Sequence, residues 1–191
     1  MMDAHTDRQP STAMHATPST PPVSRLARIA QARHLVMQES SSLAAGLVEP
    51  WIAQSWQRCL SRGLRPQDPV SFEAVSTSVM RQASEANHTL MQAARPVLKQ
   101  LGGALADTRY FAILTNHNGV VIDTDGPIDR SDRRASLITR VGVDLSENSV
   151  GTTAIGAALR ELQPVWLHRG EHFYQDTSVY SCAGAPLFGH D

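Results

Sequence analysis

Through the first half of the chain, apolar side chains recur every three or four residues, the spacing of amphipathic helices. One such stretch follows Ser24, a good N-cap residue, and predicts a helix over residues 24–39. A second begins at Pro50, which suits a first helical turn, and ends near Gly63, which suits a helix C-terminus. The N-terminal part of the chain is therefore expected to be helical.

Two further helices are expected before the pattern changes. One begins near residue 71, and a longer one covers residues 84–105, where Pro96 should kink or split it because proline lacks a backbone donor. The apolar stripe of the longer helix consists of Leu90, Ala94, Val97, Leu98, Leu101 and Leu105.

From residue 109 the pattern is typical of strands. Residues 110–115 and 120–124 are β-rich, and the Asn118-Gly119 pair between them is a strong hairpin signal. The polar residues 125–140 predict a loop or a short surface helix.

The C-terminal part mixes one helix with strands. A helix capped by Ser146, Ser149 or Thr152 should end before Pro164, followed by a short strand over residues 165–167 and a buried strand over residues 179–188. The whole order predicts an α+β fold with one sheet and helices packed on it.

Composition narrows the class of protein. The chain has 191 residues, 41% of them hydrophobic and 18% charged, with a net charge of -1. The length suits one domain with an appendage. The nearly neutral net charge provides no electrostatic attraction for nucleic acid or for an anionic membrane. Residues 1–23 are rich in proline and polar residues and are expected to be a disordered tail. Two cysteines and no signal peptide point to the cytoplasm.

Three motifs suggest chemistry, and each has a simpler interpretation. His168 to His172 matches the H-x-x-E-H zinc pattern, but Gly170 and the strand before it argue against the helix that this motif needs. The glycines at 151 and 156 lack the Lys-Ser/Thr of a phosphate loop. Cys182 has no basic neighbour in sequence to activate it. We expect no enzyme activity, no metal and no cofactor.

Several spaced motifs resemble one family, the sigma-54-dependent transcriptional activators of the acetoin-catabolism regulator type. The resemblance extends over about residues 50–188 and keeps the motifs in order. They are Ser55-Trp56 with Arg58-Cys59, Gly63 and Pro66; the helix around Pro96; residues 114–121; Val150-Gly151-Thr152, Pro164-Val165 and Glu171-His172-Phe173; and residues 182–188.

The resemblance implies a GAF-like antiparallel sheet flanked by helices, in a sensory domain over residues 84–191. Residues 24–83 would form an N-terminal helical segment. Such a domain binds a small-molecule effector, often as a homodimer, and relays the signal to AAA+ and helix-turn-helix output domains that this chain does not contain. The family's sheet continues past "PLFGHD", so a truncated product is expected. Residues 110–115 would then lack the last strand beside them and would have unpaired backbone groups on that edge.

The effector is expected between the sheet and the loops at residues 151–153 and 171–173. The candidate ligand-binding residues are Thr152, Thr153, Trp166, His172, Phe173 and Cys182. Glu171 and His172 have an alternative role, in which they only fix the turn.

Two other functions remain open at this point. The helices around residues 26–29 and 52–56 would pair across a two-fold axis in a dimerisation module. A small enzyme would use either the zinc motif or the Cys182 thiol.

Overall fold

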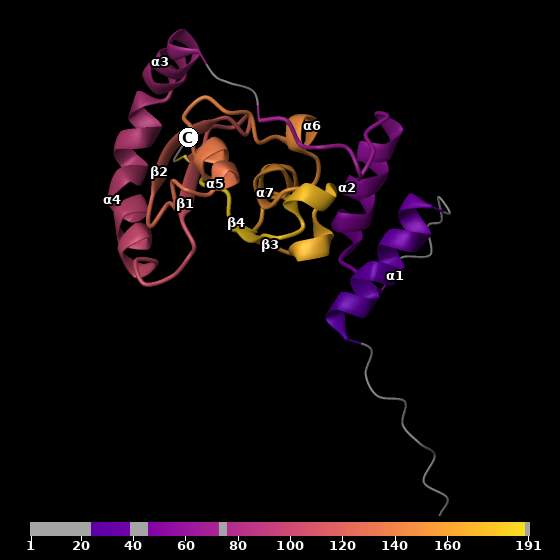
Figure 1. The fold of residues 1–191 in the computed structure, drawn as a ribbon. Helices are drawn as coiled ribbons and strands as arrows, with labels where there is room; N and C mark the ends of the chain where they lie inside the picture. Colours follow the sequence, from indigo (N-terminus) through magenta and orange to yellow (C-terminus); the bar gives the residue numbers. More distant parts are fainter. Residues whose placement is uncertain (1–23, 39–45, 73–75, 190–191) are drawn as a thin grey trace, which may run out of the picture.

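The computed structural model describes residues 24–38, 46–72 and 76–189; the predicted tail over residues 1–23 lies outside this described part. Helices α3 and α4 lie at one end of the fold and α1 and α2 at the other, with the strands and the short helices between them (Figure 1). In the described part, no helix has both the length and the apolar content needed to cross a bilayer.

The two N-terminal helices form as their local signals predict. Helix α1 covers Arg25–Met37, and the Ser24 side chain accepts a hydrogen bond from the amide of Ala27. Helix α2 covers Pro50–Ser61, and Gly63 follows it with a φ of +81°. The two helices share one core with two aromatic residues from the C-terminal part of the chain. That buried cluster contains Ile29, Ala32, Val36, Val48, Ile52, Trp56, Cys59, Phe173 and Tyr174.

The next two helices begin later than predicted. Helix α3 covers Thr77–Ala86 and not a stretch from residue 71, and its N-cap is Ser76. Helix α4 covers His88–Ala104 and contains Pro96 without a break. Of the two outcomes predicted at this proline, a kink or a split, the split does not occur. The break lies at Asn87, whose side-chain amide donates to the carbonyl of Ala83 in place of a backbone N–H.

Only part of the predicted stripe on α4 is buried. Ala94 and Leu98 pack against the hairpin, whereas Val97 and Leu101 are 63% and 48% exposed.

The hairpin itself is confirmed: β1, Ala112–Thr115, pairs antiparallel with β2, Val121–Asp125.

The hairpin turn forms from local side-chain bonds. The Asn116 carboxamide oxygen accepts from the amides of Asn118 and Val120, and Gly119 takes a φ of +83°. After β2, the polar segment contains the short helix α5, Arg133–Ile138, which is capped by the Asp132 carboxylate.

The single predicted helix after residue 146 is two helices. Helix α6 covers Glu147–Val150 and helix α7 covers Ala154–Glu161. Thr153 caps α7, since its hydroxyl accepts from the amide of Gly156. Neither Ser149 nor Thr152 is an N-cap. The last elements are β3 (Val165–His168), η1 (Arg169–Glu171), η2 (Gln175–Thr177) and β4 (Ser181–Gly184).

The expectation of one sheet is wrong in the described part of the chain, which has two antiparallel sheets of two strands each, β1-β2 and β3-β4. Residues 142–145 cover one edge of β2: Val121 donates to Val143, Gly142 donates to Val121, Leu145 donates to Gly119, and Val120 forms an isolated antiparallel bridge with Asp144. A further strand cannot pair with this edge, where these bonds already form.

The buried strand predicted over residues 179–188 is also shorter than expected. Only Ser181–Gly184 pairs, with β3, while Val179, Leu187 and Phe188 are each more than 60% exposed. Gly184 permits this pairing because α7 passes very close to its backbone. A Cβ at this position would lie 2.5 Å from the carbonyl oxygen of Ala154.

Replacing Gly184 with alanine is therefore expected to destabilise the chain by about 2 kcal/mol through this overlap with backbone. Gly103 is a matched control, because a Cβ there meets nothing within 4 Å and the residue lies in α4. Gly103→Ala should instead stabilise by about 0.5–1 kcal/mol. Urea denaturation followed by circular dichroism measures both; equal effects of the two substitutions would refute the close approach.

Candidate functional site

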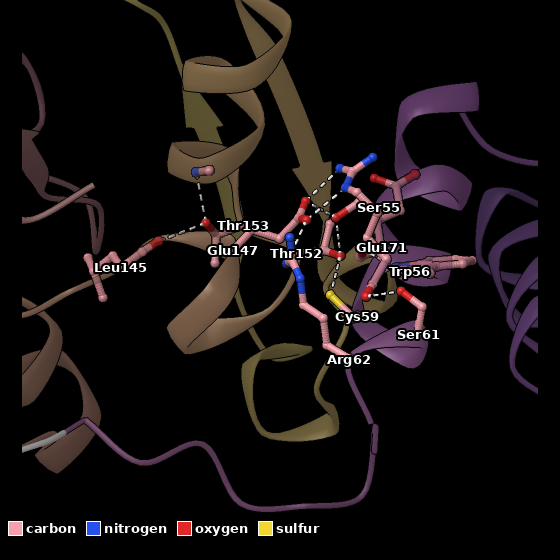
Figure 2. A network of polar contacts seen from close by, with 12 residues as sticks. Ser55, Trp56, Cys59, Ser61, Arg62, Leu145, Glu147, Thr152, Thr153 and Glu171 are labelled. Atoms are coloured by element: carbon pink, nitrogen blue, oxygen red, sulfur yellow. Dashed lines mark hydrogen bonds and ion pairs between the residues drawn. The ribbon is translucent and has the colours of Figure 1, made fainter. Parts of the chain in front are cut away.

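A polar network centred on Glu147, the first residue of α6, joins α2 to α6 and to the loop before α7 (Figure 2). Arg58 of α2 donates to both carboxylate oxygens of Glu147, from Nε at 2.8 Å and Nη2 at 2.6 Å. Arg62 Nη1 adds a contact at 3.3 Å, and the Ser55 hydroxyl donates at 2.7 Å. One carboxylate thus receives donors from two residues of α2 and from Arg62, its C-cap residue.

The charge state of Glu147 follows from this arrangement. Burial raises the pKa of its carboxyl, but the hydrogen bonds from Arg58 and Ser55, together with the charges of Arg58 and Arg62, outweigh burial and bring the pKa below its usual 4.5. The pair is therefore ionised at neutral pH.

The network continues into the buried interface between α2 and the loop before α7. The Ser55 and Thr152 hydroxyl oxygens are 2.7 Å apart, and both residues are almost fully buried. Because the Ser55 proton is donated to Glu147, Thr152 is the donor in this contact. The Cys59 sulfur lies 4.0 Å from the Thr152 hydroxyl, and burial raises the pKa of this thiol to about 11. Cys59 is therefore a neutral thiol and a poor nucleophile.

Arg33 of α1 fixes the loop that follows β3. Its Nη1 donates to the carbonyls of Gly170 at 2.9 Å and His172 at 2.6 Å, and its Nη2 donates to that of Phe173 at 2.9 Å. Its guanidinium carbon also lies 5.4 Å from the ring centroid of Trp56. Burial lowers the pKa of Arg33 to about 10, so the guanidinium still carries its charge at neutral pH.

Glu171 attaches the same loop to both N-terminal helices. Its buried carboxylate accepts from Arg25 Nη2, 3.0 Å from each oxygen, and from the His168 amide at 2.6 Å. Its carbonyl oxygen accepts from the Trp56 indole at 2.9 Å. The H-x-x-E-H motif thus lies on a strand end and a 3-10 turn, where its glutamate has a structural role.

The structure places the predicted ligand-binding residues in three different surroundings. Thr152, His172 and Phe173 are each no more than 2% exposed and lie where α2 and α1 pack against the loops. The His172 ring nitrogen Nδ1 lies 2.9 Å from the Arg169 carbonyl, and burial lowers the pKa of this imidazole. The space between the two predicted loops therefore contains side chains of α2.

The other three residues lie elsewhere. Thr153 caps α7. Trp166 is 59% exposed on one face of the β3-β4 sheet, opposite Ala183, whereas Cys182 lies on the other face opposite Leu167. Burial raises the pKa of the Cys182 thiol to about 11.

A cavity of about 310 Å³ lies beside α5, away from all six of these residues. Three separate parts of the chain form it: residues 70–72 after α2, helix α5, and residues 176–180 around η2. Its walls consist of Val70, Ser71, Phe72, Arg133, Arg134, Leu137, Asp176, Thr177 and Tyr180. The volume matches pockets that hold small metabolites.

The ion pair between Arg134 and Asp176 forms part of the wall of this cavity. Arg134 donates from Nη1 to the Asp176 carbonyl and from Nη2 to the Asp176 carboxylate, each at 2.9 Å. The buried Thr177 hydroxyl donates to the Tyr174 carbonyl, so its proton is already used within the protein. The apolar side of the wall consists of Val70, Phe72, Leu137 and Tyr180.

A second, shallower groove of about 290 Å³ borders the Glu147 network. Its lining residues include Arg62, His117, Glu147 and Arg160. Neither hollow contains a metal site, and within the described ranges no three His, Cys, Asp or Glu side chains come together as metal ligands.

Sequence reasoning did not identify the cavity residues beside α5. Arg133 and Arg134 lie in the polar stretch that predicts a loop or a short surface helix, the predicted helix begins near residue 71, and Asp176 belongs to no motif. The one available signal was the run of alternating charge over residues 129–134, which predicts a surface loop equally well.

Comparison with known proteins identifies one family and several bacterial relatives. The family described as "MimR, N-terminal domain" matches residues 27–189. The acetoin dehydrogenase operon transcriptional activator AcoR of Bacillus subtilis is 30% identical over 141 residues, which cover 73% of this chain and 23% of that protein. The acetoin catabolism regulatory protein of Cupriavidus necator is 33% identical over 141 residues, or 72% of this chain and 21% of that protein.

A third relative is the propane 2-monooxygenase operon transcriptional activator MimR of Mycolicibacterium goodii, 28% identical over 149 residues, with 78% of this chain and 24% of that protein covered. The chain thus spans about a quarter of the length of these curated relatives. The resemblance to the N-terminal region of acetoin-type regulators is confirmed.

Among solved structures, the fold is similar to one in the crystal structure of the Escherichia coli DhaR(N)-DhaL complex. The TM-score is 0.60 at 23% identity, over 73% of this chain and 47% of that chain. The mixed fold of helices and small antiparallel sheets therefore recurs in a solved protein.

Proposed function

This chain belongs to the MimR N-terminal domain family, and on that premise we propose that it is the effector-sensing region of a sigma-54-dependent transcriptional activator. It binds a small metabolite and relays the signal to AAA+ and helix-turn-helix output domains. Its role is regulatory and not enzymatic, and it acts in the cytoplasm. Support comes from the relatives, which are named as transcriptional activators or regulators.

We assign the part from residue 84 onward to a GAF-like sensory domain. The antiparallel hairpin β1-β2 packed against α4 supports the assignment, as does the fold shared with the DhaR(N)-DhaL structure. The N-terminal helices α1 and α2 belong to the same functional unit, because their core includes Phe173 and Tyr174.

The observation that carries the proposal is the cavity beside α5. It has the volume of a metabolite site, and its walls come from segments more than one hundred residues apart, such as Phe72 and Tyr180. A ligand in the cavity would contact both the η2 region and residues 70–72, which lead from α2 to α3. Binding would thereby change the stability of contacts between the two ends of the fold.

The six residues predicted from the sequence keep a different role in this proposal. Thr152, His172 and Phe173 connect the loops to α1 and α2, and contact with the effector by any of the six stays a prediction. Dimerisation through the apolar faces of α1 and α2 is less favoured, because Ile29, Ile52 and Trp56 are buried within the chain.

A thermal-shift experiment on the 191-residue chain tests the cavity. The probes are acetoin, hexanoate, benzoate and the corresponding amides, hexanamide and benzamide. A ligand at one hundred times its Kd stabilises by about 2.7 kcal/mol, which raises Tm by roughly 5–10 °C for a chain of this size. At least one probe is expected to produce such a shift.

Leu137→Trp fills the cavity and should abolish that shift, since Leu137 lines it. Val97→Trp is the control, because Val97 is 63% exposed on α4 and lines neither hollow. A shift that survives Leu137→Trp, or the absence of any shift in the unmodified chain, would count against the cavity as the effector site.

A further inference from the structure

We propose that the effector of this cavity is a small organic carboxylate, whose charged end binds Arg133 and Arg134 and whose apolar body lies against Phe72, Leu137 and Tyr180. The inference rests on the proposed function, since it names the chemical class of the ligand at the same site. Three features of the cavity wall support a carboxylate: its charged residues, the hydrogen-bond partners of those residues, and the position of its apolar side chains.

The cavity wall has a surplus of positive charge. Among the residues that line the cavity, Arg133 and Arg134 are cationic and Asp176 is the one carboxylate, so the lining carries one net positive charge. The nearby Asp132 carboxylate caps α5 by accepting from the amides of Arg134 and Ala135, and it is not a lining residue. Within the described ranges, Arg133 has no hydrogen-bond or ion-pair partner. A cation that borders a hollow and lacks an internal partner favours an anionic ligand.

Arg134 is oriented in advance to receive a carboxylate. Its bond to the Asp176 carbonyl fixes the guanidinium through Nη1, independently of the Asp176 carboxylate on Nη2. The side chains of Arg134 and Asp176 are 43% and 38% exposed, so their ion pair is weak and can exchange. A ligand carboxylate can therefore compete with Asp176 for Arg134 while the guanidinium stays in place.

The rest of the wall selects the body of the ligand. Val70, Phe72, Leu137 and the ring of Tyr180 are apolar surfaces, and the Thr177 hydroxyl already donates to Tyr174. Beside the charged groups, the wall offers the hydroxyls of Ser71 and Tyr180. A sugar or a polyol would therefore leave several of its hydroxyl groups unpaired against the apolar side of the wall. One acidic group on a short aliphatic or aromatic body fits the wall better.

Calorimetric titration of the 191-residue chain with two matched pairs tests the inference: hexanoate against hexanamide, and benzoate against benzamide. Within each pair the apolar body is the same and only the charge differs. At least one carboxylate is expected to bind ten times or more tighter than its amide. Equal affinity of carboxylate and amide in both pairs would overturn the inference.

Three variants locate the effect. Arg133→Gln should remove most of the advantage of the carboxylate, while Asp176→Asn, which removes the competing charge, should tighten carboxylate binding at least threefold. Arg160→Gln is the charge-matched control, because Arg160 lies at the other groove, and it should change neither affinity more than twofold. Circular dichroism verifies that each variant is folded.

The outcomes separate this inference from the proposed function. If the amides bind as tightly as the carboxylates and Leu137→Trp abolishes both, the cavity is the effector site and the carboxylate inference is wrong. If no probe binds, or Leu137→Trp leaves binding unchanged, both are overturned. If Asp176→Asn weakens carboxylate binding, competition for Arg134 is refuted.

Discussion

Replacing Arg33 with alanine is expected to lower the free energy of unfolding by about 3 kcal/mol, because it removes one charged donor from three carbonyls at once. These carbonyls, of Gly170, His172 and Phe173, belong to a loop whose buried residues complete the core of α1 and α2. The substitution also removes the contact between the guanidinium and the Trp56 ring. Urea denaturation monitored by circular dichroism measures the loss.

Two further variants separate the roles of charge and shape at Arg33. Arg33→Lys keeps the charge but not the planar fork, so it should recover only a minor part of the stability. Arg28→Ala removes an exposed arginine from the same helix and should change stability by less than about 0.5 kcal/mol. Hydrogen exchange at residues 170–173 should accelerate only in the Arg33 variants. If Arg33→Ala lowered the free energy of unfolding no more than Arg28→Ala does, the hydrogen bonds from Arg33 to this loop would contribute little to stability.

Glu147→Gln is expected to cost about 2–3 kcal/mol at pH 7, because it leaves the Arg58 guanidinium, whose side chain is only 22% exposed, without its carboxylate. Glutamine keeps the size of the side chain, so the loss reports on charge. Glu85→Gln is the matched control: its pair with Arg81 spans 3.7 Å, and both side chains are more than 70% exposed. That variant should lose less than about 0.5 kcal/mol.

The pH dependence of the Glu147 contribution has a definite sign. Its folded pKa lies below the usual 4.5, so the folded state favours the ionised form. The stabilisation is therefore fully present above about pH 5 and is lost as the pH falls through the folded pKa, below 4.5. The stability difference between the unmodified chain and Glu147→Gln should shrink between pH 7 and about pH 3. A difference that grows on acidification would contradict the ionised pair.

Features set by neighbouring residues are the ones that the sequence predicts well. Ser24 caps α1, Pro50 begins α2 and the turn at Asn116 forms, because each depends on bonds within about four residues. The split predicted at Pro96 does not occur. Pro96 and Gln92 are both exposed, so water can satisfy the Gln92 carbonyl, which lacks its helical donor.

The extent of the sheet was predicted less well for a related reason. Residues 179–188 form an apolar run of mostly small residues that predicts one buried strand, yet only Ser181–Gly184 pairs with β3. Strand length depends on where a partner strand passes, and composition does not contain that information. Residues 142–145, which occupy the edge of β2, likewise had no sequence signal that distinguished them from a loop.

The sequence by itself determined the family, most helices, the hairpin and the loops that bear the recognisable motifs. Only the tertiary structure decided that side chains of α2 lie between those loops, and that a cavity lies beside α5. The physical reason is distance along the chain: Ser55 meets Thr152 across 97 positions, and Arg33 meets Gly170 across 137. Contacts of that range depend on how whole elements pack together, and no local pattern of residue types specifies them.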